Sequence, residues 1–180
     1  DRGLFSTTEI KLEATLHKPR GDGPFPVVVF SHGSTGPGAI PRTQTYNATG
    51  FGQYLNNKGI VLLIPMRRGR GKSEGDYNES YECDLSQAEY GIKYASASLD
   101  AVFGYLKSQR WADLDKVVLA GQSRGGILSV IYAANNPSVA QGVINISGGW
   151  MGDGCNVYPD INVTLFKDAG AKLKTPTLFL

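Results

Sequence analysis

The chain has 180 residues, of which 41% are hydrophobic and 19% charged, and its formal net charge is +2. This composition is typical of a globular domain with a sizeable core and excludes a disordered or fibrous protein. The small, scattered charge argues against a nucleic-acid partner, and no apolar run reaches the roughly 20 residues of a membrane span. We expect a single domain over residues 1–180, with no nucleic-acid and no membrane partner.

The first part of the chain predicts three strands and a short helix. Residues 9–17 alternate between apolar and polar side chains, as a half-buried strand does. Residues 26–31 and 60–66 are continuous apolar runs, typical of buried strands in a parallel sheet. Residues 51–57 predict a helix that stops before Gly59.

The remainder of the chain continues the alternation of helix and strand. Residues 86–110 predict a long helix, in which Ser86 and Glu89 have the spacing of a capping box. Strands are expected at 117–120, 142–146 and 176–180, and helices at 127–134 and 163–173. This order predicts an α/β fold, a mostly parallel doubly wound sheet with helices on both faces.

The most informative segment is Val117 to Gly126, VVLAGQSRGG, in which a serine lies between an apolar strand and a helical pattern. In a G-x-S-x-G turn, glycines at 121 and 125 let strand and helix approach closely, so the Ser123 hydroxyl stands clear of the backbone. The N-terminus of the following helix points free N–H groups at developing negative charge. The segment predicts a nucleophile and half an oxyanion hole, and the alternative is an ordinary strand-to-helix turn.

Two histidines call for separate interpretations. The turn from His32 to Gly36 follows a buried strand, and its glycines can expose backbone N–H groups as an anion-binding nest. The His32 ring is expected to hold this turn in shape rather than to act as a base, and His17 is expected to be structural.

The loop RRGRGKSEG, residues 67–75, resembles a phosphate-binding loop only superficially. A P-loop needs glycine where Met66 stands, and a dinucleotide fingerprint needs glycine where Glu74 stands. Nucleotide binding is therefore the weaker alternative. We expect the basic side chains of this loop to be solvated or ion-paired: Arg67, Arg68, Arg70 and Lys72.

The two cysteines, Cys83 and Cys155, follow predicted strands on the same rim of the sheet. One disulfide and two free thiols are both compatible with this placement. A start at Asp1 rather than Met slightly favours a processed, secreted or periplasmic protein over a cytoplasmic one. Trp150 and Met151 are candidates for lining a substrate pocket, with core packing as the alternative for Trp150. The sequence predicts neither a cofactor nor a metal site.

Four segments in this order resemble the α/β-hydrolase superfamily, and within it the dienelactone-hydrolase-like serine esterases: PVVVFSHGSTG, IVLLIPMRRGRGKSEG, VVLAGQSRGG and INISGGW. The resemblance implies that Ser123 is the nucleophile and that the backbone N–H groups of Ser34 and Arg124 form the oxyanion hole. It also implies acyl-enzyme hydrolysis of a small-molecule ester. Dienelactone hydrolases proper carry a cysteine nucleophile, so the serine favours simple carboxylic esters, or an acyl-peptide, as the substrate.

The resemblance also implies a catalytic acid and a histidine, in that order, after the serine. No histidine follows Ser123, and three aspartates precede the position expected for the acid and receive no role: Asp153, Asp160 and Asp168. We expect a segment beyond Leu180, or a second chain, to supply both groups and to pair with the edge strand 176–180. The 180 residues alone are then inactive, and the alternative function is a non-catalytic, hydrolase-like binding module.

Overall fold

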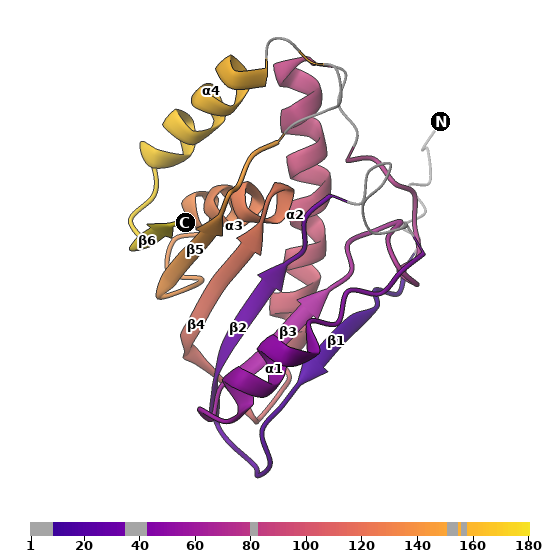
Figure 1. Ribbon diagram of the computed structural model, residues 1–180, viewed down its shortest axis with the longest axis vertical. Coiled ribbons are helices and arrows are strands. Elements are labelled where there is room, and N and C mark those ends of the chain that lie inside the picture. The colour runs from indigo at the N-terminus through magenta and orange to yellow at the C-terminus, as the bar shows by residue number, and fades with distance from the viewer. Residues whose placement is uncertain (1–8, 35–42, 80–82, 151–154, 156–157) are drawn as a thin grey trace, which may run out of the picture.

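The computed structural model describes residues 9–34, 43–79, 83–150, 155 and 158–180. Its strands are β1 (Ala14–His17), β2 (Phe25–Ser31), β3 (Val61–Pro65), β4 (Ala112–Gln122), β5 (Gly142–Ile146) and β6 (Thr177–Phe179). Its helices are α1 (Thr49–Asn56), α2 (Leu85–Lys107), α3 (Arg124–Asn135) and α4 (Tyr158–Gly170). Figure 1 shows how these elements form one sheet with helices packed on it.

The strands form a single sheet in the order β1-β3-β2-β4-β5-β6. Among the strands of the described residues, β1 alone runs antiparallel to its neighbour, and the other pairs are parallel. Because parallel strands joined by helical crossovers point the same way, the carboxyl ends of β2, β4 and β5 meet at one edge. The structure thus confirms the predicted mostly parallel α/β fold.

Two apolar clusters cover the two faces of the sheet, since successive strand residues point to opposite sides. Val27 and Val29 of β2 pack in the larger cluster with α2, α3 and α4. Val28 and Phe30 pack in the smaller one, where α1 contributes Leu55. Figure 1 shows α1 on one side of the sheet and α2 and α3 on the other. None of the helices within the described ranges is long and apolar enough to cross a membrane.

The predicted boundaries of several elements were wrong. The first strand, expected over 9–17, is limited to β1, and β4 begins five residues earlier than its apolar run. The capping box was also misplaced, because Asp84 caps α2 and its carboxylate accepts a hydrogen bond from the backbone N–H of Gln87 at 3.1 Å. A carboxylate next to the first helical residue is a stronger acceptor than a serine hydroxyl within the helix.

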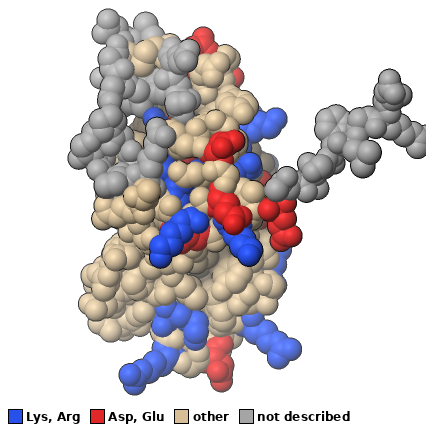
Figure 2. Space-filling model, turned by 90° about the vertical axis from the view of Figure 1, so that its right-hand side faces the viewer, with Lys and Arg blue, Asp and Glu red and all other residues tan. Residues whose placement is uncertain are grey.

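Charged side chains are mixed on the surface. On the face shown in Figure 2, acidic and basic side chains are interspersed, and no large patch of one sign is visible. This distribution agrees with the small net charge of +2.

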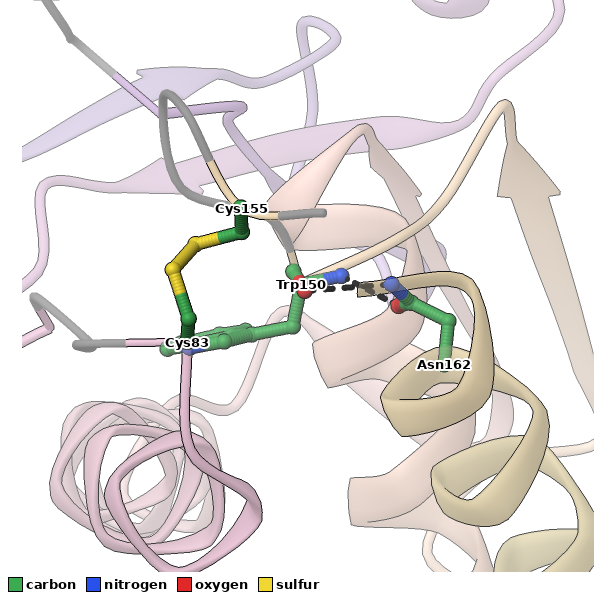
Figure 3. The surroundings of a disulfide bond; sticks show 4 residues. All are labelled: Cys83, Trp150, Cys155 and Asn162. Atoms are coloured by element: carbon green, nitrogen blue, oxygen red, sulfur yellow. Dashed lines mark hydrogen bonds between the residues drawn. A yellow bond between two sulfur atoms is a disulfide. The ribbon is translucent and has the colours of Figure 1, made fainter. Parts of the chain in front are cut away.

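Cys83 and Cys155 form a disulfide bond, with their Cα atoms 5.3 Å apart. The bond joins the segment before α2 to the connection between β5 and α4 (Figure 3). Of the two alternatives that the sequence left open, the structure therefore contains the disulfide.

Replacing both cysteines by serine is expected to destabilise the protein. The bond closes a loop with a sequence separation of 72 residues, and the chain-entropy model gives about 4 kcal/mol for such a loop. Urea unfolding of the double variant Cys83→Ser/Cys155→Ser should show this loss. Wild type treated with a reductant should unfold at the same midpoint as the variant, and equal stability of all three samples would contradict the prediction.

Candidate functional site

Ser123 lies between the end of β4 and the start of α3. Its backbone has φ 54° and ψ −123°, a conformation that residues with a side chain rarely adopt. Its N–H donates to the Ile146 carbonyl at 2.9 Å, and its own carbonyl accepts from the N–H groups of Gly126 at 2.9 Å and Gly149 at 3.2 Å. These bonds to neighbouring segments hold the strained turn, with the serine side chain half-buried at its apex.

Two glycines make this turn possible. A Cβ atom on Gly121 would overlap the carbonyl oxygen of Gly125, and one on Gly125 would overlap the carbonyl oxygen of Ser31. Neither position has room for a side chain. The start of α3 is therefore in direct backbone contact with β2 and β4. This is the close approach for which the sequence predicted glycine at both positions.

The turn after β2 lies against Ser123. A Cβ atom on Gly33 would be 3.4 Å from the Ser123 Cβ and 2.6 Å from the Gln122 side-chain oxygen. Ser34, the next residue, is half-buried. Arg124 is the first residue of α3, where a backbone N–H has no acceptor within the helix. The two segments predicted to supply N–H donors therefore flank the serine.

His32 is buried and holds its own turn. Its Nδ1 lies 2.7 Å from the Gly33 carbonyl oxygen. Burial, and then the charge of Arg67, lower the pKa of His32 to about 3 from an ordinary 6.5, so the ring is neutral at pH 7 and Nδ1–H donates this bond. His17 lies in β1, with Nε2 2.6 Å from the Asn47 carbonyl oxygen. Both rings therefore have the structural contacts that the sequence analysis expected.

Two of the arginines after β3 are buried rather than solvated, and Arg67 forms the ion pair that the prediction gave as the alternative. Arg67 and Arg70 are each only 1% exposed. Arg67 donates from Nε and Nη2 to the two carboxylate oxygens of Glu79, at 2.5 and 3.0 Å, and from Nη1 to the His32 carbonyl at 2.8 Å. The Arg70 guanidinium lies over the Tyr77 ring, 3.6 Å from its centroid. Burial raises the cost of an unpaired charge, which explains the ion pair.

Glu79 and Arg124 extend this network to the serine turn. Burial alone would raise the pKa of Glu79, but the charge and hydrogen bonds of Arg67 outweigh it and hold that pKa below its ordinary value. Arg124 Nη1 donates to the Tyr77 hydroxyl at 2.8 Å and to the Glu79 carbonyl at 3.0 Å. Sequence reasoning missed Tyr77 and Glu79, and the one available signal was an arginine directly after a buried strand.

Trp150 is fully buried and belongs to the core rather than to a pocket wall. Its ring centroid lies 4.8 Å from the Arg124 guanidinium, and its backbone exchanges two hydrogen bonds with the Asn162 side chain (Figure 3). No part of the Trp150 ring is exposed, so Trp150 does not line an open pocket. The alternative of core packing holds, and the ring packs against the Arg124 guanidinium. Met151, its predicted companion, lies outside the described residues, as does Asp153.

Asp160 and Asp168, the other aspartates without a predicted role, are exposed on α4. Within the described ranges, no group of three or more His, Cys, Asp or Glu side chains could hold a metal ion.

Comparison with known proteins supports the interpretation of the fold. A model of the family described as "Putative esterase" matches residues 6–151. Esterase Est1E of Butyrivibrio proteoclasticus, solved with ferulic acid bound, superposes with a TM-score of 0.68 at 20% identity, covering 94% of this chain and 74% of that one. The acylaminoacyl peptidase of Pyrococcus horikoshii gives 0.64 at 18% identity, covering 97% and 30%. These likenesses establish the α/β-hydrolase fold.

The curated proteins that are similar in sequence include two enzymes much longer than this chain. The proline iminopeptidase of Thermoplasma volcanium is 36% identical over 95 residues, which are 53% of this chain and 27% of that protein. The poly(3-hydroxyalkanoate) depolymerase C of Paucimonas lemoignei is 25% identical over 146 residues, 81% of this chain and 33% of that protein. The chain thus spans about a third or less of the curated relatives it matches.

Adding one methyl group at Gly125 should be far more damaging than adding it at Gly104. In Gly125→Ala the methyl group would meet the Ser31 carbonyl, whereas Gly104 lies inside α2 and a methyl group there would have nothing within 4 Å. We expect a loss of about 1–3 kcal/mol for Gly125→Ala from overpacking and a gain of about 0.5–1 kcal/mol for Gly104→Ala. Urea unfolding measures both, and equal effects would refute the close approach at the serine turn.

Proposed function

The chain belongs to the esterase family, and we propose that it is the part of a carboxylic-ester hydrolase that carries the nucleophile, Ser123. The observation that supports this most is the backbone of Ser123, held at φ 54° between β4 and α3. Such strain is maintained at functional sites because the surroundings force it. The turn at Gly33 lies so near the serine that an added Cβ atom would be 3.4 Å from the Ser123 Cβ, which supports this turn as the second half of the proposed reaction site.

The proposed reaction is a two-step acyl transfer. Ser123 Oγ attacks the ester carbonyl carbon while its proton passes to a general base, and the carbonyl oxygen becomes an oxyanion. The backbone N–H groups of Ser34 and Arg124 donate to this oxyanion, each contributing roughly 3 kcal/mol to lowering the barrier. The alcohol then leaves with a proton, and water hydrolyses the acyl-enzyme to release the acid and restore the serine.

The general base is a separate part of the proposal. No histidine follows Ser123 in the sequence, and the neutral His32 ring donates to Gly33 within its own turn. We propose that a further segment, beyond Leu180 or on a second chain, carries the acid and histidine and pairs with β6. In support, β6 is the last strand of the sheet among the described residues, and Leu178 and Phe179 are 53% and 59% exposed.

A simple carboxylic ester is the preferred substrate class within this proposal. The family description and the likeness to Est1E and to an acetyl xylan esterase of Paenibacillus sp. R4 favour it. We propose, within the same interpretation, that the chain is one of the dienelactone-hydrolase-like serine esterases. An acyl-peptide is the second candidate, favoured by the similarity to the proline iminopeptidase and the acylaminoacyl peptidase. A binding module without catalysis is the alternative from a different class.

A fluorophosphonate probe tests the nucleophile directly. The full-length polypeptide should react with the probe at Ser123 and hydrolyse p-nitrophenyl acetate, because an activated serine attacks such phosphorus and carbonyl centres whereas an unactivated hydroxyl is a poor nucleophile. Mass spectrometry of the labelled peptide identifies the residue.

The control is Ser123→Ala, which removes only the hydroxyl and should abolish labelling and turnover while leaving the fold intact. Absence of labelling in the full-length wild type, beside a known esterase that is labelled, would favour the binding module. Faster cleavage of acyl-peptides than of esters would favour the peptidase.

A further inference from the structure

One buried carboxylate joins the segments that surround Ser123. Glu79, in the connection between β3 and α2, is 0% exposed and binds the Arg67 guanidinium through both oxygens. Its backbone carbonyl accepts from Arg124 Nη1, which also lies 4.0 Å from a Glu79 carboxylate oxygen. The Tyr77 hydroxyl accepts a second bond from the same Nη1 atom. We call these four residues, Arg67, Tyr77, Glu79 and Arg124, the Glu79 cluster.

The Glu79 cluster reaches both sides of the proposed oxyanion hole. On one side, Arg67 Nη1 donates to the carbonyl of His32, in the turn that leads to Ser34. On the other side, the cluster holds the side chain of Arg124, whose own backbone N–H is the second proposed donor. Glu79 is therefore the common partner of Arg67 and Arg124. Arg67 holds the turn that leads to Ser34, and Arg124 begins α3 and carries the other proposed donor.

The Arg67–Glu79 pair of the cluster is far more buried than a surface ion pair. Arg67 and Glu79 side chains are each 1% exposed, whereas Lys116 of the Lys116–Asp113 pair is 67% exposed. In a buried site, side chains have few alternative rotamers and no water to replace a lost partner. A change in the Glu79 carboxylate must therefore be taken up by the guanidinium groups and the backbone attached to them. Tyr77 is half-buried and contributes by accepting a hydrogen bond from Arg124.

We propose that Glu79 and Tyr77 are positioning residues of the oxyanion hole, which they act on through Arg67 and Arg124. This inference rests on the proposed ester hydrolysis at Ser123. It assigns a role to the loop after β3 that goes beyond stabilising the fold. Oxyanion donors bind the transition state more strongly than the substrate, so their displacement lowers kcat and leaves KM nearly unchanged. A purely structural cluster would lower stability without this split.

Tyr77→Phe is the decisive variant, with Tyr132→Phe as its matched control. Each removes one tyrosine hydroxyl that is bonded to a charged side chain, and each acts on α3, because Tyr132 lies in that helix and donates to Asp100 at 2.8 Å. In the full-length polypeptide, Tyr77→Phe should lower kcat for p-nitrophenyl acetate roughly tenfold with KM within about twofold, because the oxyanion donors act mainly in the transition state. Tyr132→Phe should leave both constants nearly unchanged, with a similar shift of the urea midpoint.

Glu79→Gln is the larger perturbation, since it keeps the shape of the side chain but removes the charge that both arginines share. We expect a fall in kcat of roughly 100-fold, the size that misplaced catalytic groups produce. If this variant does not fold, Tyr77→Phe alone decides. Wild-type kcat in Tyr77→Phe, or a rise in KM alone, would overturn the positioning role. Unlabelled Ser123 in the wild type would instead overturn the proposed function, and this inference with it.

Discussion

The whole site depends on the contact between the first turn of α3 and the carboxyl end of β2. A Cβ atom on Gly125 would overlap the Ser31 carbonyl oxygen, so the two backbones touch without any side chain between them. The buried Ser129 hydroxyl fixes the next turn of the helix, at 2.8 Å from the Gly125 carbonyl and 3.1 Å from that of Ala120. With helix and strand locked together, the chain can enter α3 only through a strained residue, and that residue is Ser123.

A second layer holds the groups around this contact. The Arg124 side chain lies between the Tyr77–Glu79 segment and the buried ring of Trp150. The disulfide joins the chain just after Glu79 to the chain just after Trp150, through Cys83 and Cys155. The Tyr77–Glu79 segment on one side of the Arg124 guanidinium and Trp150 on the other are therefore linked covalently through the disulfide. This arrangement restricts their movement relative to each other and so restricts the position of the α3 N-terminus.

Sequence reasoning was successful where local chemistry determines the structure. The apolar runs predicted β2, β3 and β5, and the glycines at 121 and 125 predicted the tight turn, because no other residue fits there. It failed where the structure depends on contacts between residues that are far apart in the sequence. The burial of Arg67 depends on Glu79, which is separated from it by a loop, and nothing in the local pattern marks that pair. The first five residues of β4 are too polar to predict a strand, and of these five only Ala112 pairs with β2, opposite Phe25.

The central claim is that Ser123 and the two flanking backbone N–H groups of Ser34 and Arg124 converge on one reacting atom. The most direct measurement is a crystal structure of the full-length polypeptide with a phosphonate ester bound covalently to the Ser123 oxygen. The account predicts a phosphonyl oxygen about 2.7–3.1 Å from both nitrogen atoms, the distance at which oxyanion-hole donors act. A phosphonyl oxygen that faces solvent, or that is held by other groups, would contradict it.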